Sequence, residues 1–267
     1  VEAITPSMKP FTCPFVVLKH SVVSEAKRKE HSANSDIIVG TAGNDHIVAM
    51  QGNDTVRGGA GDDEIVGDCG YIKTDPLAAT CPGGNDKLYG DAGDDFISAE
   101  TGDDTLEGGD GHDNMYGGQN NDTLRGGTGN DQMHGNRDND KLYGEAGNDC
   151  VYGGPGNDKL YGNEGNDYIM DESGNNEIEP GPGNDTIQGG SGNDAITLQA
   201  TDTGKKYIHI DTMGTNTLAC PSQLKFSGQR VGEHLYLKSA AGELEVWLES
   251  FYSGSKIIPT GCGALPQ

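Results

Sequence analysis

The chain is poor in the residues from which a conventional hydrophobic core is built. Only 33% of its 267 residues are hydrophobic, 6% are aromatic, and there is a single Trp. A globular domain usually contains about 45–50% apolar residues, so we expect no large apolar core. Low hydrophobicity combined with high net charge normally indicates disorder. A folded chain of this composition therefore needs a source of stability other than apolar burial.

Basic residues and long apolar runs are also scarce. The chain has 18 Lys and Arg against 42 Asp and Glu, a formal net charge of −24. Because nucleic acids and anionic membrane surfaces repel such a chain, we expect neither as a partner. No stretch approaches the roughly 18–20 apolar residues that a membrane span requires.

Motifs of common catalytic centres are missing. There is no H-E-x-x-H helix and no G-x-S-x-G turn, and the seven His residues are scattered. No C-x-x-C pair occurs, which argues against a zinc site or a thioredoxin-like redox role. We therefore expect that the chain is not an enzyme.

Glycine is abundant, with 43 residues, and the chain repeats with a period of nine. Each repeat is marked by a carboxylate or amide residue, at Asp45, Asp54, Asp63, Asp86, Asp95, Asp104, Asp113, Asp122, Asp131, Asp140, Asp149, Asp158, Asp167, Asn176, Asp185 and Asp194. Gly stands two residues earlier, except at Asn120 and Asp138. An aliphatic residue or Met follows two residues later in every repeat, at Ile47, Val56, Ile65, Leu88, Ile97, Leu106, Met115, Leu124, Met133, Leu142, Val151, Leu160, Ile169, Ile178, Ile187 and Ile196. Such self-similarity predicts a repeat architecture.

The repeat unit resembles the nonapeptide G-G-x-G-x-D-x-U-x of the repeats-in-toxin family. Two of the best copies begin at Gly108 and Gly153, and the resemblance covers residues 40–197. It implies an all-β fold: a parallel β-roll, which is a right-handed β-solenoid with two nonapeptides in each 18-residue coil. Gly permits the tight turns, and the D-x-U-x part forms a short strand with one inward side chain.

Apolar burial alone does not hold such a roll together. One buried aliphatic side chain contributes about 1.5–3 kcal/mol, whereas ordering each residue of the repeat costs about 1–2 kcal/mol in backbone entropy. Stacking also places Asp95 over Asp113 and Asp113 over Asp131, where bare carboxylates repel one another. A hard divalent cation with oxygen ligands turns this repulsion into cohesion.

The resemblance implies which residues bind that cation, because in this family each Ca²⁺ lies between stacked turns. The sixteen marker residues, Asp45 to Asp194 with Asn176 included, would supply side chains. Backbone carbonyls would come from Gly-rich positions, best represented by Gly108, Gly109, Asp110, Gly111, Gly126, Gly127, Thr128, Gly129, Gly153, Gly154, Pro155 and Gly156. The match is weaker at Asn176, which lacks the charge, and near Asp54 and Asp104, where Met50 and Glu100 replace the second Gly.

The distribution of charge agrees with ion binding. Residues 37–197 carry 7 basic and 32 acidic residues, a net charge of −25, whereas residues 1–36 carry +1 and residues 198–267 are neutral. About a dozen Ca²⁺ ions would nearly cancel this charge. A solvated acidic surface is the alternative, but it needs neither a nine-residue period nor a glycine frame. Mg²⁺ is disfavoured because it retains water and demands strict octahedral geometry.

Three regions follow: an N-terminal segment or cap over residues 1–36, the calcium-binding roll over residues 37–197, and a C-terminal antiparallel β cap over residues 198–267. A short helix is expected within residues 21–31. Fourteen extra residues, 67–80, interrupt the period, and we expect a surface loop at about residues 67–81 there. The alternation of apolar residues between positions 224 and 257 predicts antiparallel strands that cover the open end of the solenoid.

The six Cys residues suggest structural disulfides and an oxidising compartment. Cys69 and Cys81 flank the inserted loop and are predicted to pair, with two free buried thiols as the alternative. Cys220 and Cys262 bracket the C-terminal cap and are predicted to pair. Cys13 and Cys150 would then join the N-terminal segment to the roll, or form an intermolecular bond.

We interpret the chain as an extracellular, secreted protein that Ca²⁺ folds. It begins with Val and shows no apolar signal core in residues 1–36, which suggests a removed export signal. Its role would be that of a matrix, adhesion or filament component, which binds itself head-to-tail or laterally, or binds extracellular matrix or a glycan. The alternative is a detached C-terminal calcium-binding or secretion module of an extracellular enzyme, such as a protease, lipase or polysaccharide-modifying enzyme. An ice-binding surface is disfavoured because the outward positions after each Asp are irregular.

Overall fold

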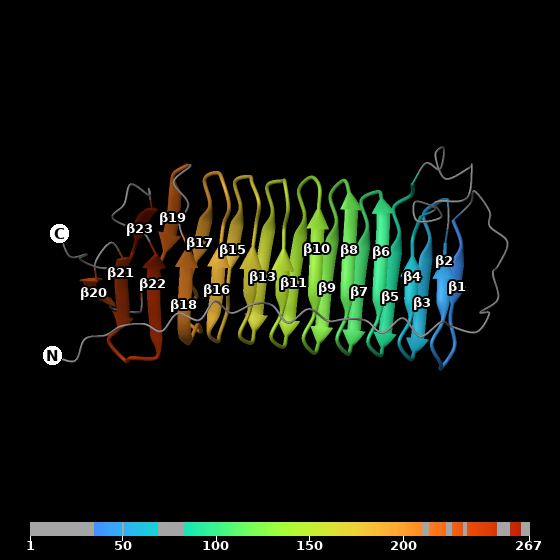
Figure 1. The fold of residues 1–267 in the computed structure, drawn as a ribbon, viewed down its shortest axis with the longest axis horizontal. Helices are drawn as coiled ribbons and strands as arrows, with labels where there is room; N and C mark the ends of the chain where they lie inside the picture. The colour runs from blue at the N-terminus through green and yellow to red at the C-terminus, as the bar shows by residue number, and fades with distance from the viewer. Residues whose placement is uncertain are drawn as a thin grey trace.

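The protein is an elongated solenoid of β-strands (Figure 1). This computed structural model describes residues 35–49, 51–68, 83–209, 214–222, 226–231, 234–249 and 257–262. Every regular element in these ranges is a strand, which confirms the predicted all-β class. The helix expected within residues 21–31 lies outside them. Within the same ranges, nothing meets the length and hydropathy that a membrane-crossing helix requires.

Two long sheets run along the axis. In spatial order, one consists of β1 (Ile37–Val39), β3 (Thr55–Ala60), β5 (Lys87–Ala92), β7 (Thr105–Asp110), β9 (Thr123–Thr128), β11 (Lys141–Ala146), β13 (Lys159–Glu164), β15 (Glu177–Glu179), β17 (Ala195–Thr197), β19 (Asn216–Ala219) and β23 (Ile257–Thr260). The other consists of β2 (His46–Val48), β4 (Glu64–Val66), β6 (Phe96–Thr101), β8 (Asn114–Gln119), β10 (Gln132–Asn136), β12 (Cys150–Tyr152), β14 (Tyr168–Met170), β16 (Asp185–Gln188), β18 (Gly204–His209), β22 (Leu244–Glu249), β21 (His234–Ser239) and β20 (Phe226–Val231). The chain alternates between the sheets, so each coil contributes one strand to each.

The register confirms two nonapeptides per coil. Leu106 pairs with Leu124, and Leu124 with Leu142, in parallel strands 18 residues apart. Across the interruption, Val56 pairs with Leu88 in the same parallel fashion. The strands on either side of the interruption therefore keep the register of the ladder. Cys69 and Cys81 lie outside the described residues, so their pairing stays a prediction.

The apolar core is a single file along each sheet. The sixteen predicted inward residues are all buried, with exposed fractions between 0% and 9%. Strand burial alternates with a period of two, as in β9, where Leu124 is buried between partly exposed Thr123 and Arg125. Each nonapeptide thus adds one apolar side chain to the interior, and polar turn residues fill the rest.

Glycine is required at particular turn positions because the backbone there is left-handed. The position two residues before most markers carries a positive φ, for example 130° at Gly129. Asn120 and Asp138, which replace Gly at this position, adopt φ values of 78° and 74°. Asn and Asp tolerate this conformation better than other residues. Glu100, in the second Gly position, also has a φ of 79°, so the turn is preserved there at the cost of some strain. Met50 is outside the described residues.

The ladders continue beyond the last repeat. β18 and β19 add parallel strands after β16 and β17, and β22 and β23 add another pair. Among the described strands, only β20, β21 and β22 form an antiparallel meander, which accounts for the alternation predicted there. The repeat sequence therefore ends at Ile196, but the solenoid does not end with it.

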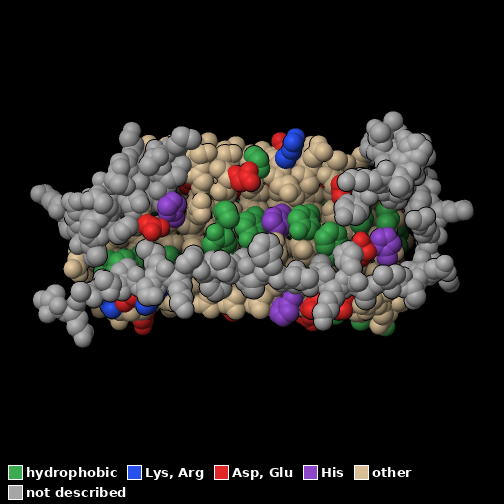
Figure 2. All heavy atoms as spheres, viewed as in Figure 1, with side chains coloured by type: hydrophobic (Ala, Val, Ile, Leu, Met, Phe, Trp, Pro, Cys, Tyr) green, Lys and Arg blue, Asp and Glu red, His purple; other side chains and the backbone are tan. Residues whose placement is uncertain are grey.

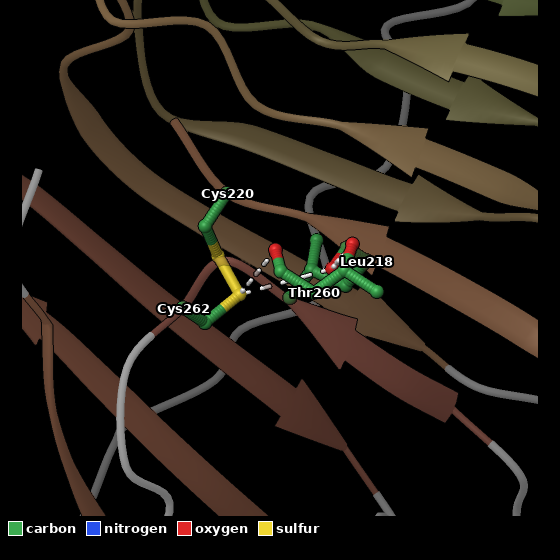
Figure 3. The surroundings of a disulfide bond; sticks show 4 residues. All are labelled: Leu218, Cys220, Thr260 and Cys262. Atoms are coloured by element: carbon green, nitrogen blue, oxygen red, sulfur yellow. Dashed lines mark hydrogen bonds between the residues drawn. A yellow bond between two sulfur atoms is a disulfide. The ribbon is translucent and has the colours of Figure 1, made fainter. Parts of the chain in front are cut away.

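The C-terminal strands are joined by a disulfide. Cys220 follows β19, Cys262 follows β23, and these two residues are bonded with their Cα atoms 4.9 Å apart (Figure 3). The Cys220 amide also donates to the Thr260 carbonyl at 2.8 Å. The predicted pairing of Cys220 with Cys262 is thereby confirmed. Cys150, at the start of β12, is 3% exposed and is also disulfide-bonded, and its partner lies outside the described residues. The bond to Cys13 stays a prediction.

Aromatic side chains stack on the outside of the second sheet. The rings of Phe96, Tyr116, His134, Tyr152 and Tyr168 follow one another with centroids 4.6–6.1 Å apart. Figure 2 shows hydrophobic and His side chains in a line along this broad face. Burial lowers the pKa of His134 to about 4, so its ring is neutral in this row. Neighbouring rungs of a parallel sheet favour such contacts.

Candidate metal centres in the stacked turns

The marker residues form two columns, one at the start of the strands of each sheet. The first column precedes the strands of the first sheet and comprises Asp54, Asp86, Asp104, Asp122, Asp140, Asp158, Asn176 and Asp194. The second column precedes the strands of the second sheet and comprises Asp45, Asp63, Asp95, Asp113, Asp131, Asp149, Asp167 and Asp185. The structure thus brings all sixteen predicted residues into two stacks.

One carboxylate oxygen of each stacked Asp accepts a backbone hydrogen bond. The amide of Asp95 donates to Oδ1 of Asp113 at 2.8 Å, and the amide of Asp113 donates to Oδ1 of Asp131 at 2.9 Å. The same bond recurs from coil to coil, with donor–acceptor distances of 2.6–3.1 Å. These bonds fix the orientation of each side chain, so that the second oxygen of every Asp points in an equivalent direction.

That second oxygen is buried and has no hydrogen-bond donor within the described part of the chain. This holds for Oδ2 of Asp54, Asp63, Asp86, Asp95, Asp104, Asp113, Asp122, Asp131, Asp140, Asp149, Asp158 and Asp167. These twelve side chains are 0–3% exposed. A buried carboxylate oxygen without a partner is costly, and native proteins rarely leave one unpaired. Twelve equivalent cases in one molecule therefore indicate a missing positive partner.

Backbone carbonyls lie near these oxygens in the second column. A Cβ atom added to Gly90 would lie closer than 3.0 Å to both Asp95 Oδ2 and the carbonyl oxygen of Gly108. Equivalent crowding by an Asp Oδ2 and a carbonyl of the next coil occurs at Gly58, Gly108, Gly126 and Gly144. We call this space beside the glycine Cα the turn cradle. Only Gly leaves it open, and its walls are oxygen atoms.

The other predicted carbonyl residues lie in the same turns but have varied partners. The carbonyls of Asp110, Thr128 and Pro155 accept hydrogen bonds from Gly93, Gly111 and Asp138 in the preceding coil. The carbonyls of Gly153 and Gly154 accept from Asn136 and Ser173. Those of Gly109, Gly111 and Gly156 face Gly127, Gly129 and Gly174 of the next coil. Gly108 and Gly126 are the ones whose carbonyls approach an Asp Oδ2 at a cradle.

Burial changes the acidity of the columns. Burial, and to a smaller extent the neighbouring carboxylates, raise the pKa of Asp113 to about 8, of Asp122 to about 9 and of Asp140 to about 8. A backbone hydrogen bond from the preceding Asp opposes the effect in each case. Without a cation, these carboxyl groups would therefore hold protons near neutral pH.

The turn at Asn176 differs from the others. Asn176 Oδ1 accepts from the Asp158 amide at 2.9 Å, as an Asp would, but its Nδ2 donates to the Gly189 carbonyl at 3.3 Å. Asp171, five residues earlier, stands in the first Gly position and is 3% exposed. Neither of its carboxylate oxygens has a donor within the described residues. Oδ2 of both Asp171 and Asp158 would crowd a Cβ added to Gly153, so this turn regains the carboxylate that Asn176 lacks.

Sequence reasoning missed several residues of the columns. Asp36 precedes the first column, since its amide donates to Asp54 Oδ1 at 2.7 Å. Asp68 occupies a second Gly position, is 2% exposed, and accepts from Thr101 Oγ1 at 2.8 Å. The two columns end at Asn216 and Lys206. The period predicts Asp36, which lies nine residues before Asp45, but Asp68, Asp171 and Lys206 occupy positions where the repeat has another residue.

The outer side of the turns is held differently. Asn139, Asn157, Asn175 and Asn193 form a ladder in which each Nδ2 donates to Oδ1 of the preceding coil at 2.8–3.2 Å. A second ladder links Asn130, Asn148, Asn166 and Asn184. His112 takes the place of Asn in this row, and its Nδ1 accepts from the Asn130 amide. These neutral ladders explain why Asn or Asp precedes almost every marker.

The turn cradles fit a calcium ion. Ca²⁺ prefers six to eight oxygen ligands drawn from carboxylates and backbone carbonyls, and those are the atoms that line each cradle. In the described ranges, no three His, Cys, Asp or Glu side chains gather on one point. An ion here would therefore depend on carbonyl oxygens for much of its shell. This excludes the sulfur and nitrogen ligand sets typical of zinc.

Comparison with known protein families gives the same answer. The sequence model of the RTX calcium-binding nonapeptide repeat matches residues 32–68, 83–115, 116–149, 125–160, 151–178 and 172–198. These matches cover more than half of the chain, and they leave out the segment that interrupts the period. No curated protein matches the chain. The chain belongs to the family of RTX calcium-binding nonapeptide repeats.

Proposed function

We propose that this chain is a secreted, non-enzymatic protein whose turns bind about a dozen Ca²⁺ ions and which folds when they bind. The observation that carries the proposal is the set of twelve buried Asp Oδ2 atoms that lack a donor within the described residues. Six of them, Asp63, Asp95, Asp113, Asp131, Asp149 and Asp167 of the second column, lie beside a cradle that also has a carbonyl oxygen of the next coil. The cation supplies positive charge to a buried acidic stack, and the residues of the chain supply oriented oxygens.

The proposed ligands are the Asp side chains of both columns and the carbonyls of the first Gly positions, such as Gly108 and Gly126. Three places in the columns depart from this set. Asp45 Oδ2 already accepts from Thr41 Oγ1 at 2.9 Å, Asp185 Oδ2 contacts Lys206, and Asn176 is neutral. At the last of these, Asp171 would take over as ligand, together with Asp158.

Calcium would act as a compartment-dependent folding switch. Extracellular calcium modules bind with a Kd of about 10⁻⁴–10⁻³ M, so the sites would be empty inside a cell and filled outside. The cost of bringing the acidic columns together would then be offset only after export. RTX repeats are typical of secreted proteins, which supports the extracellular assignment.

The folded roll would serve as a structural or interaction component of a matrix, an adhesive or a filament. Two features support this. The solenoid is long and regular (Figure 1), and β1 at its N-terminal end exposes 79% of Ile37 and 64% of Val39. A strand edge with exposed apolar residues favours contact with another chain.

Circular dichroism and sedimentation velocity, followed from EDTA to millimolar Ca²⁺, test the proposal. We expect a cooperative gain of β-structure with compaction of the chain. A large species that grows with protein concentration would support self-assembly. Mg²⁺ at the same concentrations serves as the control and should produce little change. A chain that is equally folded in EDTA would contradict calcium-driven folding.

A further inference from the structure

A lysine occupies the last position of the second column. Lys206 in β18 pairs in register with Asp185 in β16, where each preceding coil of that column has an Asp. The column therefore ends with a change of sign, from carboxylate to ammonium. Lys206 is 0% exposed, although lysine is almost never fully buried unless it is paired.

The Lys206 ammonium contacts three oxygen atoms. Its Nζ donates to Asp185 Oδ2 at 2.5 Å, to the Gly183 carbonyl at 2.7 Å and to the Thr203 carbonyl at 2.9 Å. An ammonium has three protons, so these partners use all of them. The ligands are one buried carboxylate oxygen and two carbonyls of the turns. They are the same kinds of atom that line the turn cradles.

The contrast within the second column is direct. From Asp63 to Asp167, each Asp of the column leaves Oδ2 without a donor within the described residues. Asp185 is the next residue of the column, and its Oδ2 has a donor because Lys206 reaches it. An ordinary surface ion pair would not show this pattern, since both side chains here are 0% exposed.

We propose that Lys206 is a built-in cation that takes the place of Ca²⁺ at the turn of Asp185. Two cations would repel each other strongly in so small and buried a space, so this turn holds the ammonium instead of an ion. The last turn of the column therefore closes without calcium, and its ion sites end at the preceding coil. This inference rests on the proposed calcium binding by the other turns.

Three variants of the full chain test this. Lys206→Asp restores the residue type of the column and should convert the turn into an ion site. Lys206→Ala removes the cation and leaves its three oxygens in place. Lys205→Ala is the matched control. Lys205 is the adjacent residue on β18, but its side chain is 51% exposed and its ion pair with Glu245 is long, at 3.9 Å. Equilibrium dialysis with ⁴⁵Ca²⁺ gives the number of bound ions, and thermal unfolding over a range of Ca²⁺ concentrations gives stability.

We expect Lys206→Asp to bind one more Ca²⁺ than the unchanged protein, and to need more Ca²⁺ to reach its folding midpoint. Lys206→Ala should lower the melting temperature by several degrees at low Ca²⁺, and this loss should shrink as Ca²⁺ rises, because an ion can then enter the turn. Lys205→Ala should change neither quantity. If Lys206→Asp does not fold, the calcium dependence of Lys206→Ala still decides the matter.

Two results would overturn the inference, and they are distinguishable from failure of the proposed function. The first is an unchanged protein that binds many ions while Lys206→Asp binds no additional one. The second is a loss of stability in Lys206→Ala that is the same at every Ca²⁺ concentration, which would make Lys206 an ordinary buried ion pair. An unchanged protein that binds no Ca²⁺ would instead refute the proposed function, and the inference with it.

Discussion

The repeat region and the C-terminal strands are both solenoid, yet they are stabilised in different ways. Between residues 37 and 197 each nonapeptide buries one apolar side chain, in most cases beside a buried carboxylate, and the region carries a net charge of −25. After residue 197 the chain is neutral. There it buries a cluster that includes Leu235, Leu237, Leu244, Val246 and Leu248, and it is joined by a disulfide.

This difference shows what a β-solenoid needs in order to stay closed. Parallel pairing continues from the repeats into β18, β19, β22 and β23, so it does not by itself explain the difference, although the C-terminal strands add an antiparallel meander. Where apolar side chains are large and numerous, they provide the cohesion. Where each nonapeptide has only one, cations replace them. Lys206 lies where the two regions meet. It is a buried side chain, as in the C-terminal region, but it supplies a positive charge to Asp185, as a cation would in the repeat region.

The largest expected effect is that of pH on the repeat region. In the calcium-free roll, burial raises the pKa of Asp122 to about 9 and of Asp167 to about 8, above the value of the unfolded chain. Their contribution to stability is therefore present below about pH 4 and is lost as pH rises through these values. Ca²⁺ binds the charged form, so the sign reverses when it is present. If the binding of one Ca²⁺ ion displaces one proton, its binding free energy weakens by about 1.4 kcal/mol for each unit by which the pH falls.

Melting temperatures from pH 5 to 9 check this. In EDTA the β-structure seen by circular dichroism should be greater at pH 5 than at pH 9, and in saturating Ca²⁺ the melting temperature should rise with pH. Isothermal titration calorimetry in buffers of different ionisation enthalpy should show release of protons upon calcium binding. The same slope with and without Ca²⁺ would show that the buried carboxylates are not the calcium ligands.

The second effect concerns the C-terminal strands alone. Replacing both Cys220 and Cys262 by Ser removes a cross-link between residues separated by 42 positions. In the chain-entropy model this costs about 4 kcal/mol. Urea unfolding should register the loss, whereas the number of bound Ca²⁺ ions should stay the same. A drop in that number would mean that the two regions are not stabilised independently.

The third effect is the closure of a single turn cradle. Gly126→Ala places a methyl group closer than 3.0 Å to Asp131 Oδ2 and to the Gly144 carbonyl. We expect the loss of one ion and about 3 kcal/mol of stability in Ca²⁺, from overpacking and from the lost site. Gly43→Ala is the control, since no atom lies within 4 Å of its added Cβ. Equal effects of the two variants on calcium stoichiometry would exclude the cradle as an ion site.

The fourth effect tests the relocated carboxylate. Asp171→Gly restores the repeat residue but removes the charge that replaces that of Asn176, so one ion should be lost. This corresponds to about 1.4 kcal/mol at ten times Kd. Adding Asn176→Asp to this variant should recover the ion, as measured by equilibrium dialysis. If the double variant binds no more ions than Asp171→Gly, the two positions do not share a site.

The smallest effect is expected on the outer side of the turns. Asn157→Ala removes the hydrogen bond from Asn157 Nδ2 to Asn139 Oδ1, which is 3.0 Å long and exposed. It also removes the Asn157 Oδ1 acceptor for Asn175. The cost should be about 1 kcal/mol by thermal unfolding, with no change in calcium stoichiometry. A lost ion would place part of the site on this outer ladder.

The sequence predicts the repeat region well because the period leaves little freedom. Two nonapeptides per coil place every marker Asp and every inward aliphatic, and the structure has Leu124 between Leu106 and Leu142 in the expected register. The period also located the inserted residues, since Val56 pairs with Leu88. In this region each position has one structural role, so spacing alone identifies it.

Prediction failed at positions of the ladder where the residue type, or the number of residues since the previous coil, differs from the repeat. Lys206 is 21 residues from Asp185, not 18, because the chain between β17 and β18 breaks the period. Asp171 occupies a position that the repeat gives to Gly, so the pattern provides no reason to regard it as a ligand. The register of β18, β19, β22 and β23 depends on long-range packing, which the local pattern does not contain.

Hydrogen exchange followed by mass spectrometry tests most directly whether cations hold the repeat region together. Peptides from residues 83–198 and from residues 234–249 should be compared in EDTA and in millimolar Ca²⁺. We predict that the repeat peptides exchange rapidly in EDTA and become protected in Ca²⁺, whereas the C-terminal peptides change much less. Repeat peptides that are equally protected in EDTA would contradict this explanation of the fold.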